Sequence, residues 1–184
     1  LSRKAPLQPG TRGVKAFVLA GGLGTRLKPQ FGDLPKSLAP LGGRPFLVRQ
    51  LEWLSSHGVR DAVILAGHGA DALRAAVGDG AKWGMRVAWS VEEQPLGTGG
   101  ALARAAPHVS GPALVINGDT LADCDPWVLE DRRWKRGAWG AVALYRVDDA
   151  ASRGRVECAP TGKIARFVEK DAGYRGPAWV NGGI

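Results

Sequence analysis

The stretch from residue 19 to residue 27 constrains the fold of this chain more than any other part of it. An apolar run at residues 14–19 leads directly into three glycines within positions 21–24. Glycine lets the backbone turn sharply and approach a ligand closely, because it has no side chain. The amide N–H groups of such a turn can point at an anion, and Arg26 adds a planar donor fork that suits phosphate. We therefore expect a buried strand that ends in a phosphate-binding turn.

Two common phosphate-binding motifs do not fit this turn. A dinucleotide fingerprint needs glycines at its first, third and sixth positions, but the sixth position counted from Gly22 is Leu27. A Walker loop ends in Gly-Lys-Ser/Thr, whereas Gly24 is followed by Thr-Arg. An ordinary strand-to-loop connection would explain the glycines alone. Together with residues 25–27 and the Leu-Pro-Lys of residues 34–36, they favour nucleotide binding.

The composition fits one globular domain of ordinary size. At 184 residues the chain can bury a core, and its hydrophobic fraction of 45% is normal. The net charge of +8 suits either a nucleic-acid surface or anionic small substrates. Since the basic run at residues 132–136 is typical of a solvated helix end, nucleic acid is not expected as a partner.

Cysteine content and hydropathy predict a cytoplasmic protein. Cys124 and Cys158 lie in no CxxC pair and in no His-Cys cluster, which favours buried thiols in a reducing compartment over metal ligation or a disulfide. No apolar run approaches the length of a membrane span, and no signal segment opens the chain. We therefore expect no membrane partner.

The order of the predicted elements indicates an α/β fold. Residues 1–13 have the composition of a flexible arm or linker, and residues 14–184 are expected to form a single domain. Apolar runs and helical spacing predict strands at 14–20, 61–66, 85–91, 112–117 and 138–145, and helices at 45–57, 70–77, 98–106 and 126–136. Two further strands, 155–158 and 164–168, are expected to form a hairpin. This order predicts a mainly parallel sheet with a small β extension.

Several polar segments follow the carboxyl ends of the predicted strands, where ligands bind in such sheets. They are the glycine loop, residues 92–100 and Asp119. The loop at residues 21–43 is also long for a strand-to-helix connection, and long loops in compact domains are usually functional or disordered. Its basic residues favour a loop that is ordered around a ligand.

Lys36 and Asp119 are the two charged residues most suited to chemistry. Lys36 lies between Pro35 and Pro40, which restrict the backbone on both sides; we favour a phosphate contact over an ordinary solvated lysine. Asp119 ends an Asn-Gly-Asp sequence at a strand end. Its carboxylate can hold Mg²⁺, which also binds phosphate and water oxygens; the alternative is a turn or cap residue.

Two other segments carry weaker signals. The glycines of residues 92–100 permit close approach, and Thr98 can begin a helix whose N-terminus faces a ligand; a plain polar loop is the alternative. Glu169 and Asn181 have side chains that suit sugar hydroxyls, and Lys170 suits another phosphate.

Taken together, the motifs resemble those of the sugar-1-phosphate nucleotidylyltransferases over residues 14–184. They occur in the order and at the spacing of that family, at residues 21–27, 34–36, 93–101, 117–119, 168–170 and 181–184. Residues 32–36 and 43–47 are most similar to the D-glycero-D-manno-heptose 1-phosphate guanylyltransferases, with the mannose-1-phosphate guanylyltransferases as the near alternative. The resemblance implies a Rossmann-like three-layer sandwich, the nucleotide-diphospho-sugar transferase fold, and is compatible with a homo-oligomer.

The resemblance also implies a reaction. An oxygen of a sugar 1-phosphate attacks the α-phosphorus of a nucleoside triphosphate, such as GTP, and pyrophosphate leaves. Catalysis then consists of positioning and charge neutralisation, with Mg²⁺ as cofactor. The implied catalytic residues are Arg26, Lys36 and Asp119, with Asp119 on the metal. The implied nucleotide-binding residues are Ala20, Gly21, Gly22, Gly24, Thr25, Arg26, Glu92, Gly97 and Thr98, and the implied sugar-phosphate residues are Gly154, Glu169, Lys170 and Asn181.

Glu92 suggests which base is bound. It lies five residues before Gly97, at a position that is often Gln in related uridylyl- and thymidylyltransferases. A carboxylate can only accept hydrogen bonds, and guanine offers two adjacent donors, N1–H and N2–H₂. We therefore hypothesise that Glu92 recognises guanine.

The chain departs from the family pattern at three places. Ser37 replaces a frequent Pro, Arg153-Gly154 replaces a frequent Tyr-Gly, and the family usually continues beyond the position of Ile184 with a second metal-binding carboxylate. We therefore expect either a C-terminally truncated chain or an incomplete metal site, and we favour truncation. A binding module for nucleotide or sugar phosphate without turnover, a uridylyltransferase and, on charge alone, a nucleic-acid-binding protein are the competing interpretations.

Overall fold

The computed structural model describes residues 13–22, 24 and 28–184. They form two compact units, one that ends at Leu121 and one that runs over Ala122–Ile184. The expected arm lies outside the described residues except for Gly13, and so do two of the expected nucleotide-binding residues, Thr25 and Arg26.

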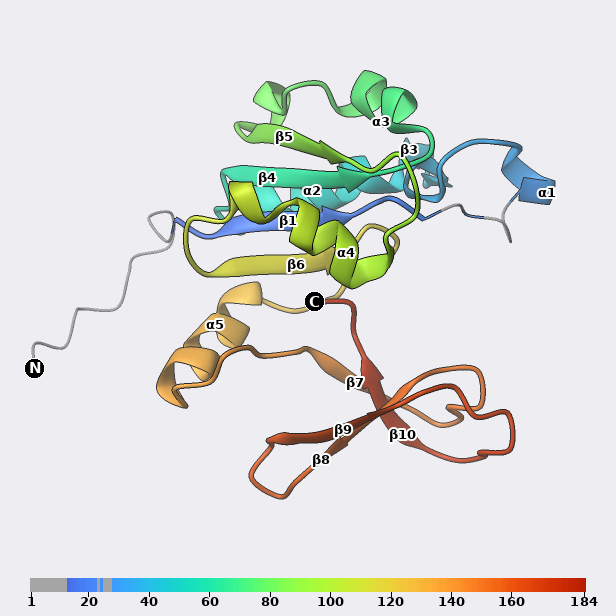
Figure 1. Cartoon of the computed structure of the whole chain (residues 1–184), viewed down its shortest axis with the longest axis vertical. Coiled ribbons are helices and arrows are strands. Elements are labelled where there is room, and N and C mark those ends of the chain that lie inside the picture. The colour runs from blue at the N-terminus through green and yellow to red at the C-terminus, as the bar shows by residue number, and fades with distance from the viewer. Residues whose placement is uncertain (1–12, 23, 25–27) are drawn as a thin grey trace, which may run out of the picture. The chain divides into compact units, whose positions relative to one another are not determined.

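The first unit consists of alternating strands and helices (Figure 1). Its strands are β1 (Lys15–Leu19), β2 (Pro40–Leu41), β3 (Arg44–Pro45), β4 (Asp61–Ala66), β5 (Arg86–Val91) and β6 (Ala113–Asn117). Its α-helices are α1 (Lys28–Phe31), α2 (Phe46–Ser56), α3 (Ala70–Val77) and α4 (Gly97–Arg104), and its short 3₁₀ helices are η2 (Lys36–Leu38), η3 (Ala81–Trp83) and η4 (Ala106–His108). The predicted strands and helices of this unit are confirmed, and each observed end lies within two residues of the predicted end.

Four of these strands form a parallel sheet in the order β5-β4-β1-β6. The two interior strands, β1 and β4, are the most buried of the four, as expected where both faces of a parallel sheet are covered. In the register, Leu19 lies opposite both Leu65 and Asn117. The carboxyl ends of β1, β4 and β6 therefore lie side by side.

Helices cover both faces of this sheet. In Figure 1, α4 lies in front of the strands and α2 behind them. Phe17 and Val63 belong to a buried cluster, and the partly buried Leu102 of α4 packs against it. Because side chains alternate along a strand, Val18 and Ile64, both fully buried, point to the opposite face. The expected three-layer α/β architecture is confirmed.

The second unit contains α5 (Pro126–Lys135) and a four-stranded antiparallel sheet. The order of its strands is β7-β10-β8-β9, where β7 is Leu144–Val147, β8 is Arg155–Cys158, β9 is Ile164–Val168 and β10 is Ala178–Asn181. The predicted hairpin is β8 with β9, and it is confirmed with one irregularity between Glu157 and Cys158. Asp125 caps α5 as its sequence suggests, since its side chain accepts a hydrogen bond from the amide of Trp127 at 2.9 Å.

The predicted strand at residues 138–145 is wrong in its position. β7 begins only at Leu144 and pairs antiparallel with β10. Its first residue lies opposite Asn181, the last residue of β10. A strand is defined by the hydrogen bonds of its partner, and this partner was not among the predicted strands.

In the part of the chain that the structure describes, no helix has the length and apolar character needed to cross a membrane.

Candidate active site

A cleft of about 570 Å³ opens at the carboxyl edge of the parallel sheet in the first unit. Segments that follow β1, β5 and β6 line it, together with the first turns of α4. Its lining residues are Leu19, Gly21, Gly22, Gly24, Leu65, Glu92, Pro95, Gly97, Thr98, Ala101, Asn117 and Asp119. Most of the predicted nucleotide-binding residues that the structure describes therefore share one cavity.

Ala20 is the exception among them. It is 3% exposed, and its amide donates a hydrogen bond to the carbonyl of Leu65 at 2.8 Å. This amide is hydrogen-bonded to β4. Ala20 therefore anchors the start of the glycine loop to the sheet.

Gly118 brings the end of β6 against the end of β1. Its amide donates to the carbonyl of Leu19 at 2.9 Å. A Cβ at this position would lie 2.6 Å from the same oxygen, so only glycine fits without a backbone shift. This close approach places Asn117 and Asp119 beside the glycine loop, which explains the Asn-Gly-Asp sequence.

Lys36 extends from a backbone that is anchored on both sides. Pro35 is buried and packs so closely on Gly69 that a Cβ there would lie 2.4 Å from its Cγ. Ser37 is 4% exposed. Gly24 packs against Lys36 itself, since a Cβ on Gly24 would lie 3.1 Å from the Cβ of Lys36. The glycine loop and the lysine are thus held together.

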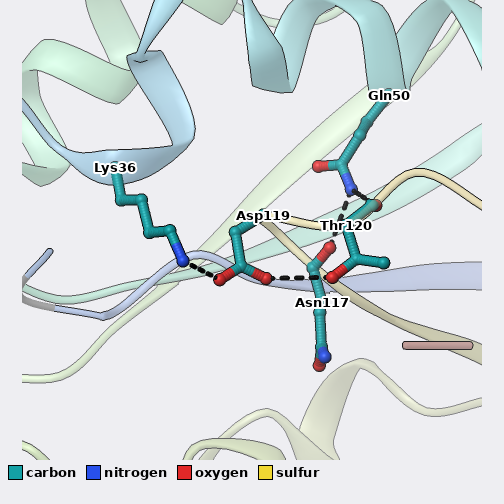
Figure 2. A network of polar contacts seen from close by, with 5 residues as sticks. All are labelled: Lys36, Gln50, Asn117, Asp119 and Thr120. Carbon is teal, nitrogen blue, oxygen red and sulfur yellow. Dashed lines mark hydrogen bonds and ion pairs between the residues drawn. The ribbon is translucent and has the colours of Figure 1, made fainter. Parts of the chain in front are cut away.

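The Lys36 ammonium meets the Asp119 carboxylate across the sheet edge, with 2.5 Å between Nζ and Oδ2 (Figure 2). The other carboxylate oxygen accepts a hydrogen bond from the Thr120 hydroxyl at 3.2 Å. The two charged side chains are 44% and 38% exposed. An ion pair so accessible contributes little to stability, but it brings a cation and an anion together at a residue that lines the cleft.

Glu92 lies between the ends of three strands. Its Oε2 accepts a hydrogen bond from the amide of Leu96 at 3.3 Å. A Cβ on Gly21 would lie 2.8 Å from its Oε1, and one on Gly67 would lie 3.3 Å from the same atom. Two glycines therefore make room for this carboxylate. Gly67 was not predicted as a site residue, although it directly follows the apolar run of β4, as Gly21 follows that of β1.

The donors fit a magnesium ion that is shared with a phosphate. Asp119 supplies an accessible carboxylate in the cleft, and Mg²⁺ commonly uses one or two carboxylates with phosphate and water oxygens. In residues 13–22, 24 and 28–184, no group of three or more His, Cys, Asp or Glu side chains could hold a metal. These residues therefore form no metal cage built by the protein alone.

The predicted sugar-phosphate residues belong to the second unit. The pairing of β10 with β8 and of β8 with β9, continued by one residue, places Asn181, Gly154 and Glu169 in one row. Side chains in one row of an antiparallel sheet lie on the same face. All three residues are exposed, and Lys170 follows Glu169 directly. The structure thus gathers these residues at one end of the second sheet.

Comparison with known proteins gives a consistent picture. A family model described as "Nucleotidyl transferase" matches residues 15–184. A D-glycero-alpha-D-manno-heptose 1-phosphate guanylyltransferase of Campylobacter jejuni is 32% identical over 171 residues, which cover 93% of this chain and 74% of the relative. A mannose-1-phosphate guanyltransferase of Aspergillus fumigatus is 35% identical over 178 residues, which cover 93% of this chain and 48% of the relative. The chain spans about half the length of the mannose-1-phosphate relatives that it matches.

Solved structures share the fold. HddC from Yersinia pseudotuberculosis, crystallised as a complex with GMP-PN, superposes with a TM-score of 0.74 at 30% identity, over 92% of this chain and 74% of that chain. A putative glucose-1-phosphate thymidylyltransferase from Bacillus anthracis superposes with a TM-score of 0.75 at 24% identity, over 92% of this chain and 69% of that chain.

Proposed function

The chain belongs to the nucleotidyl transferase family, and we propose that it transfers GMP from GTP to a sugar 1-phosphate of the heptose or mannose type. The observation that carries this proposal is the cleft at the sheet edge, where the glycine loop, Glu92 and the Lys36–Asp119 ion pair meet. A phosphate-binding turn, a cation and a carboxylate are the groups that nucleotidyl transfer requires.

The glycine loop would bind the triphosphate. Gly21, Gly22 and Gly24 line the cleft without side chains, so phosphate oxygens can approach the backbone closely. The N-terminus of α4, which begins at Gly97, also lines the cleft, and its dipole favours negative charge there. We expect Thr25 and Arg26 to complete this grip.

The chemical step needs little covalent participation from the protein. A phosphate oxygen of the sugar 1-phosphate forms a bond to the α-phosphorus of GTP, and the bond from that phosphorus to the bridging oxygen of the β-phosphate breaks. The nucleophile is already anionic, and the electron pair leaves with pyrophosphate, so no protein base is required. The Lys36 ammonium would neutralise charge on the α-phosphate oxygens as they approach the transition state.

Asp119 would hold Mg²⁺, which supplies further neutralisation of phosphate charge when it is bound. Until substrates bind, Asp119 pairs with Lys36. This pairing holds the lysine ammonium at the carboxylate that lines the cleft, while the second oxygen, Oδ1, accepts a longer hydrogen bond from the Thr120 hydroxyl.

Base selection would depend on Glu92. Its carboxylate lines the cleft and faces the loops after β1 and β4, and it can only accept hydrogen bonds, which matches the adjacent N–H groups of guanine. The names of the Campylobacter and Aspergillus relatives, both guanyl transferases, and the GMP-PN complex of HddC support guanine over a pyrimidine.

Sugar selection would depend on the second unit. Glu169 and Asn181 are suited to sugar hydroxyls, Lys170 to the sugar phosphate, and Gly154 to close approach. Their common row in the second sheet supports this assignment.

The proposal is tested by measuring pyrophosphate release in a panel that crosses four nucleoside triphosphates with mannose, heptose and glucose 1-phosphates, with and without EDTA. We expect release with GTP and one of the first two sugars, abolished by the chelator. Saturable GTP binding without release would indicate a binding module, and release with UTP would indicate a uridylyltransferase.

A further inference from the structure

Gln50 is a buried polar side chain on the apolar face of α2. It is 1% exposed, and its helix neighbours Leu47, Leu51 and Leu54 are fully buried. Burying an amide group costs free energy unless its hydrogen-bonding atoms find partners. The role of Gln50 therefore depends on where those bonds go.

Both amide protons of Gln50 go to the same turn. Its Nε2 donates to the carbonyl of Asn117 at 2.7 Å and to the carbonyl of Thr120 at 2.6 Å (Figure 2). Both partners can only accept, so the nitrogen of the amide must face them. One side chain thus ties together the two ends of the turn that carries Asp119.

The remaining polar atom, Oε1, is buried and has no hydrogen-bond partner among the described residues. A buried acceptor without a donor is unfavourable. The favourable contribution of the Gln50 amide therefore comes from its two donated bonds, both of which act on the turn.

The position of the turn decides where the Asp119 carboxylate lies. Its Oδ2 is 2.5 Å from the Lys36 ammonium, so Lys36 meets, from a separate segment, a carboxylate that lines the cleft. We propose that Gln50 is a positioning residue, which holds residues 117–120 so that Asp119 presents its carboxylate to Lys36 and to a divalent cation. This inference rests on the proposed function for the role of Asp119.

The test compares Gln50→Leu with Ser55→Ala. Ser55 lies on the same helix and donates a hydrogen bond to the carbonyl of Trp83 at 2.7 Å, which is outside the residues that line the cleft. Equilibrium dialysis measures the Kd of each protein for Mn²⁺·GTP and for GTP in EDTA, and thermal unfolding measures the Tm. The decisive quantity is the Kd for GTP in EDTA divided by the Kd for Mn²⁺·GTP. This ratio reports how much the metal strengthens nucleotide binding.

We expect Gln50→Leu to lower this ratio about 10- to 100-fold, which is the usual effect of removing a group that orients a metal ligand. Ser55→Ala is expected to lower the Tm and leave the ratio unchanged. An equal rise in both Kd values in Gln50→Leu would overturn the proposal, because loss of a purely structural residue weakens binding of GTP and of Mn²⁺·GTP alike.

Gln50→Met is the second variant, because it keeps the unbranched side chain and removes both donors. If neither variant folds while Ser55→Ala does, Gln50 is structural and the proposal is wrong. A wild-type protein that binds Mn²⁺·GTP more tightly than GTP but releases no pyrophosphate would contradict the proposed transfer and leave the inference on Gln50 intact.

Discussion

The two units of the chain bury their side chains to very different extents. In the first unit, both faces of β1 and β4 are covered, and Phe17 and Ile64 are at most 1% exposed. In the second unit, Pro126, Ala150, Val156 and Val180 are the buried apolar residues among those described, while Phe167 and Trp179 are 61% and 49% exposed.

This difference matches the two tasks that we assign to the units. Groups that stabilise developing charge must be held rigidly, and Lys36, Asp119 and Glu92 are all positioned by close packing in the first unit. Sugar hydroxyls and a phosphate can be bound by side chains on an exposed sheet. The predictions below test whether stability and chemistry depend mainly on the first unit and sugar recognition on the second.

The largest expected effect is on stability. Leu51→Ala removes a side chain that is fully buried on α2, and we expect it to lower the free energy of unfolding by about 2–5 kcal/mol. Phe167→Ala in the exposed sheet should change it by only about 0.5 kcal/mol. Urea unfolding followed by circular dichroism measures both, and equal losses would contradict the contrast between the units.

Lys36→Met tests the chemistry of the first unit. The variant removes the cation that would neutralise the α-phosphate, and we expect kcat to fall about 100- to 1,000-fold. Lys82→Met is the matched control. Lys82 lies in the same unit, its ammonium donates a hydrogen bond to the carbonyl of Ala76, and neither residue lines the cleft. A loss in kcat of similar size in both variants would remove Lys36 from the mechanism.

Lys170→Met tests the second unit. Loss of a charged contact to the sugar phosphate should raise the KM for the sugar 1-phosphate about tenfold or more, with the KM for GTP nearly unchanged. Lys163→Met, in the β8–β9 turn of the same unit, is the control. A rise in the KM for GTP instead would show that Lys170 acts on the nucleotide.

Glu92→Gln tests base selection. A Gln amide can donate as well as accept, so we expect the preference for GTP over UTP to fall about tenfold. The exposed neighbour Glu93 provides the control variant Glu93→Gln. Competition between the two nucleotides measures the preference, and an unchanged preference in Glu92→Gln would disprove our assignment of the base contact.

The smallest effect concerns acid stability, where one cross-strand ion pair from each unit can be compared. Arg86 donates to both carboxylate oxygens of Asp61, at 2.6 and 2.7 Å, and holds the pKa of Asp61 below its usual value. Arg166 lowers the pKa of Glu157 in the same way. A lowered pKa contributes stability above the unfolded pKa, about 3.9 for Asp, and this stability is lost as the pH falls through the folded pKa.

We therefore expect Asp61→Asn to flatten the acid side of the stability curve more than Glu157→Gln does. The Asp61 side chain is 31% exposed and that of Glu157 is 47% exposed, so solvent screens the second pair more strongly. Urea unfolding between pH 2 and pH 7 measures the difference, and a larger effect at Glu157 would reverse the predicted order.

The amino-acid sequence determined the parts of the fold that depend on local pattern. The run at residues 14–20 is apolar at nearly every position, and only an interior strand of a parallel sheet buries such a run on both faces. Asp125 followed by Pro specified the start of α5, because capping involves residues only two apart. The glycine loop, the segment after β5 and Asp119 also follow the carboxyl ends of strands, as predicted. The sequence was therefore sufficient to predict which edge of the sheet carries the cleft.

The position of β7 could not be predicted in this way. Residues 138–145 are sufficiently apolar for a strand, but pairing begins only where β10 supplies partners, at Leu144 opposite Asn181. Such a choice between strand and irregular chain depends on a segment more than 30 residues away, and no local pattern contains it.

Only the tertiary structure decided which polar groups meet. Lys36 and Asp119 are 83 residues apart, and Gln50 reaches a turn 67 to 70 residues away. The helical spacing of α2 places Gln50 on the same face as Leu47, Leu51 and Leu54. Its hydrogen-bond partners, however, are determined by the packing of that helix against the sheet. Side-chain contacts over such separations are fixed by packing in three dimensions, which is why the sequence identified the members of the site but not the network that holds Asp119.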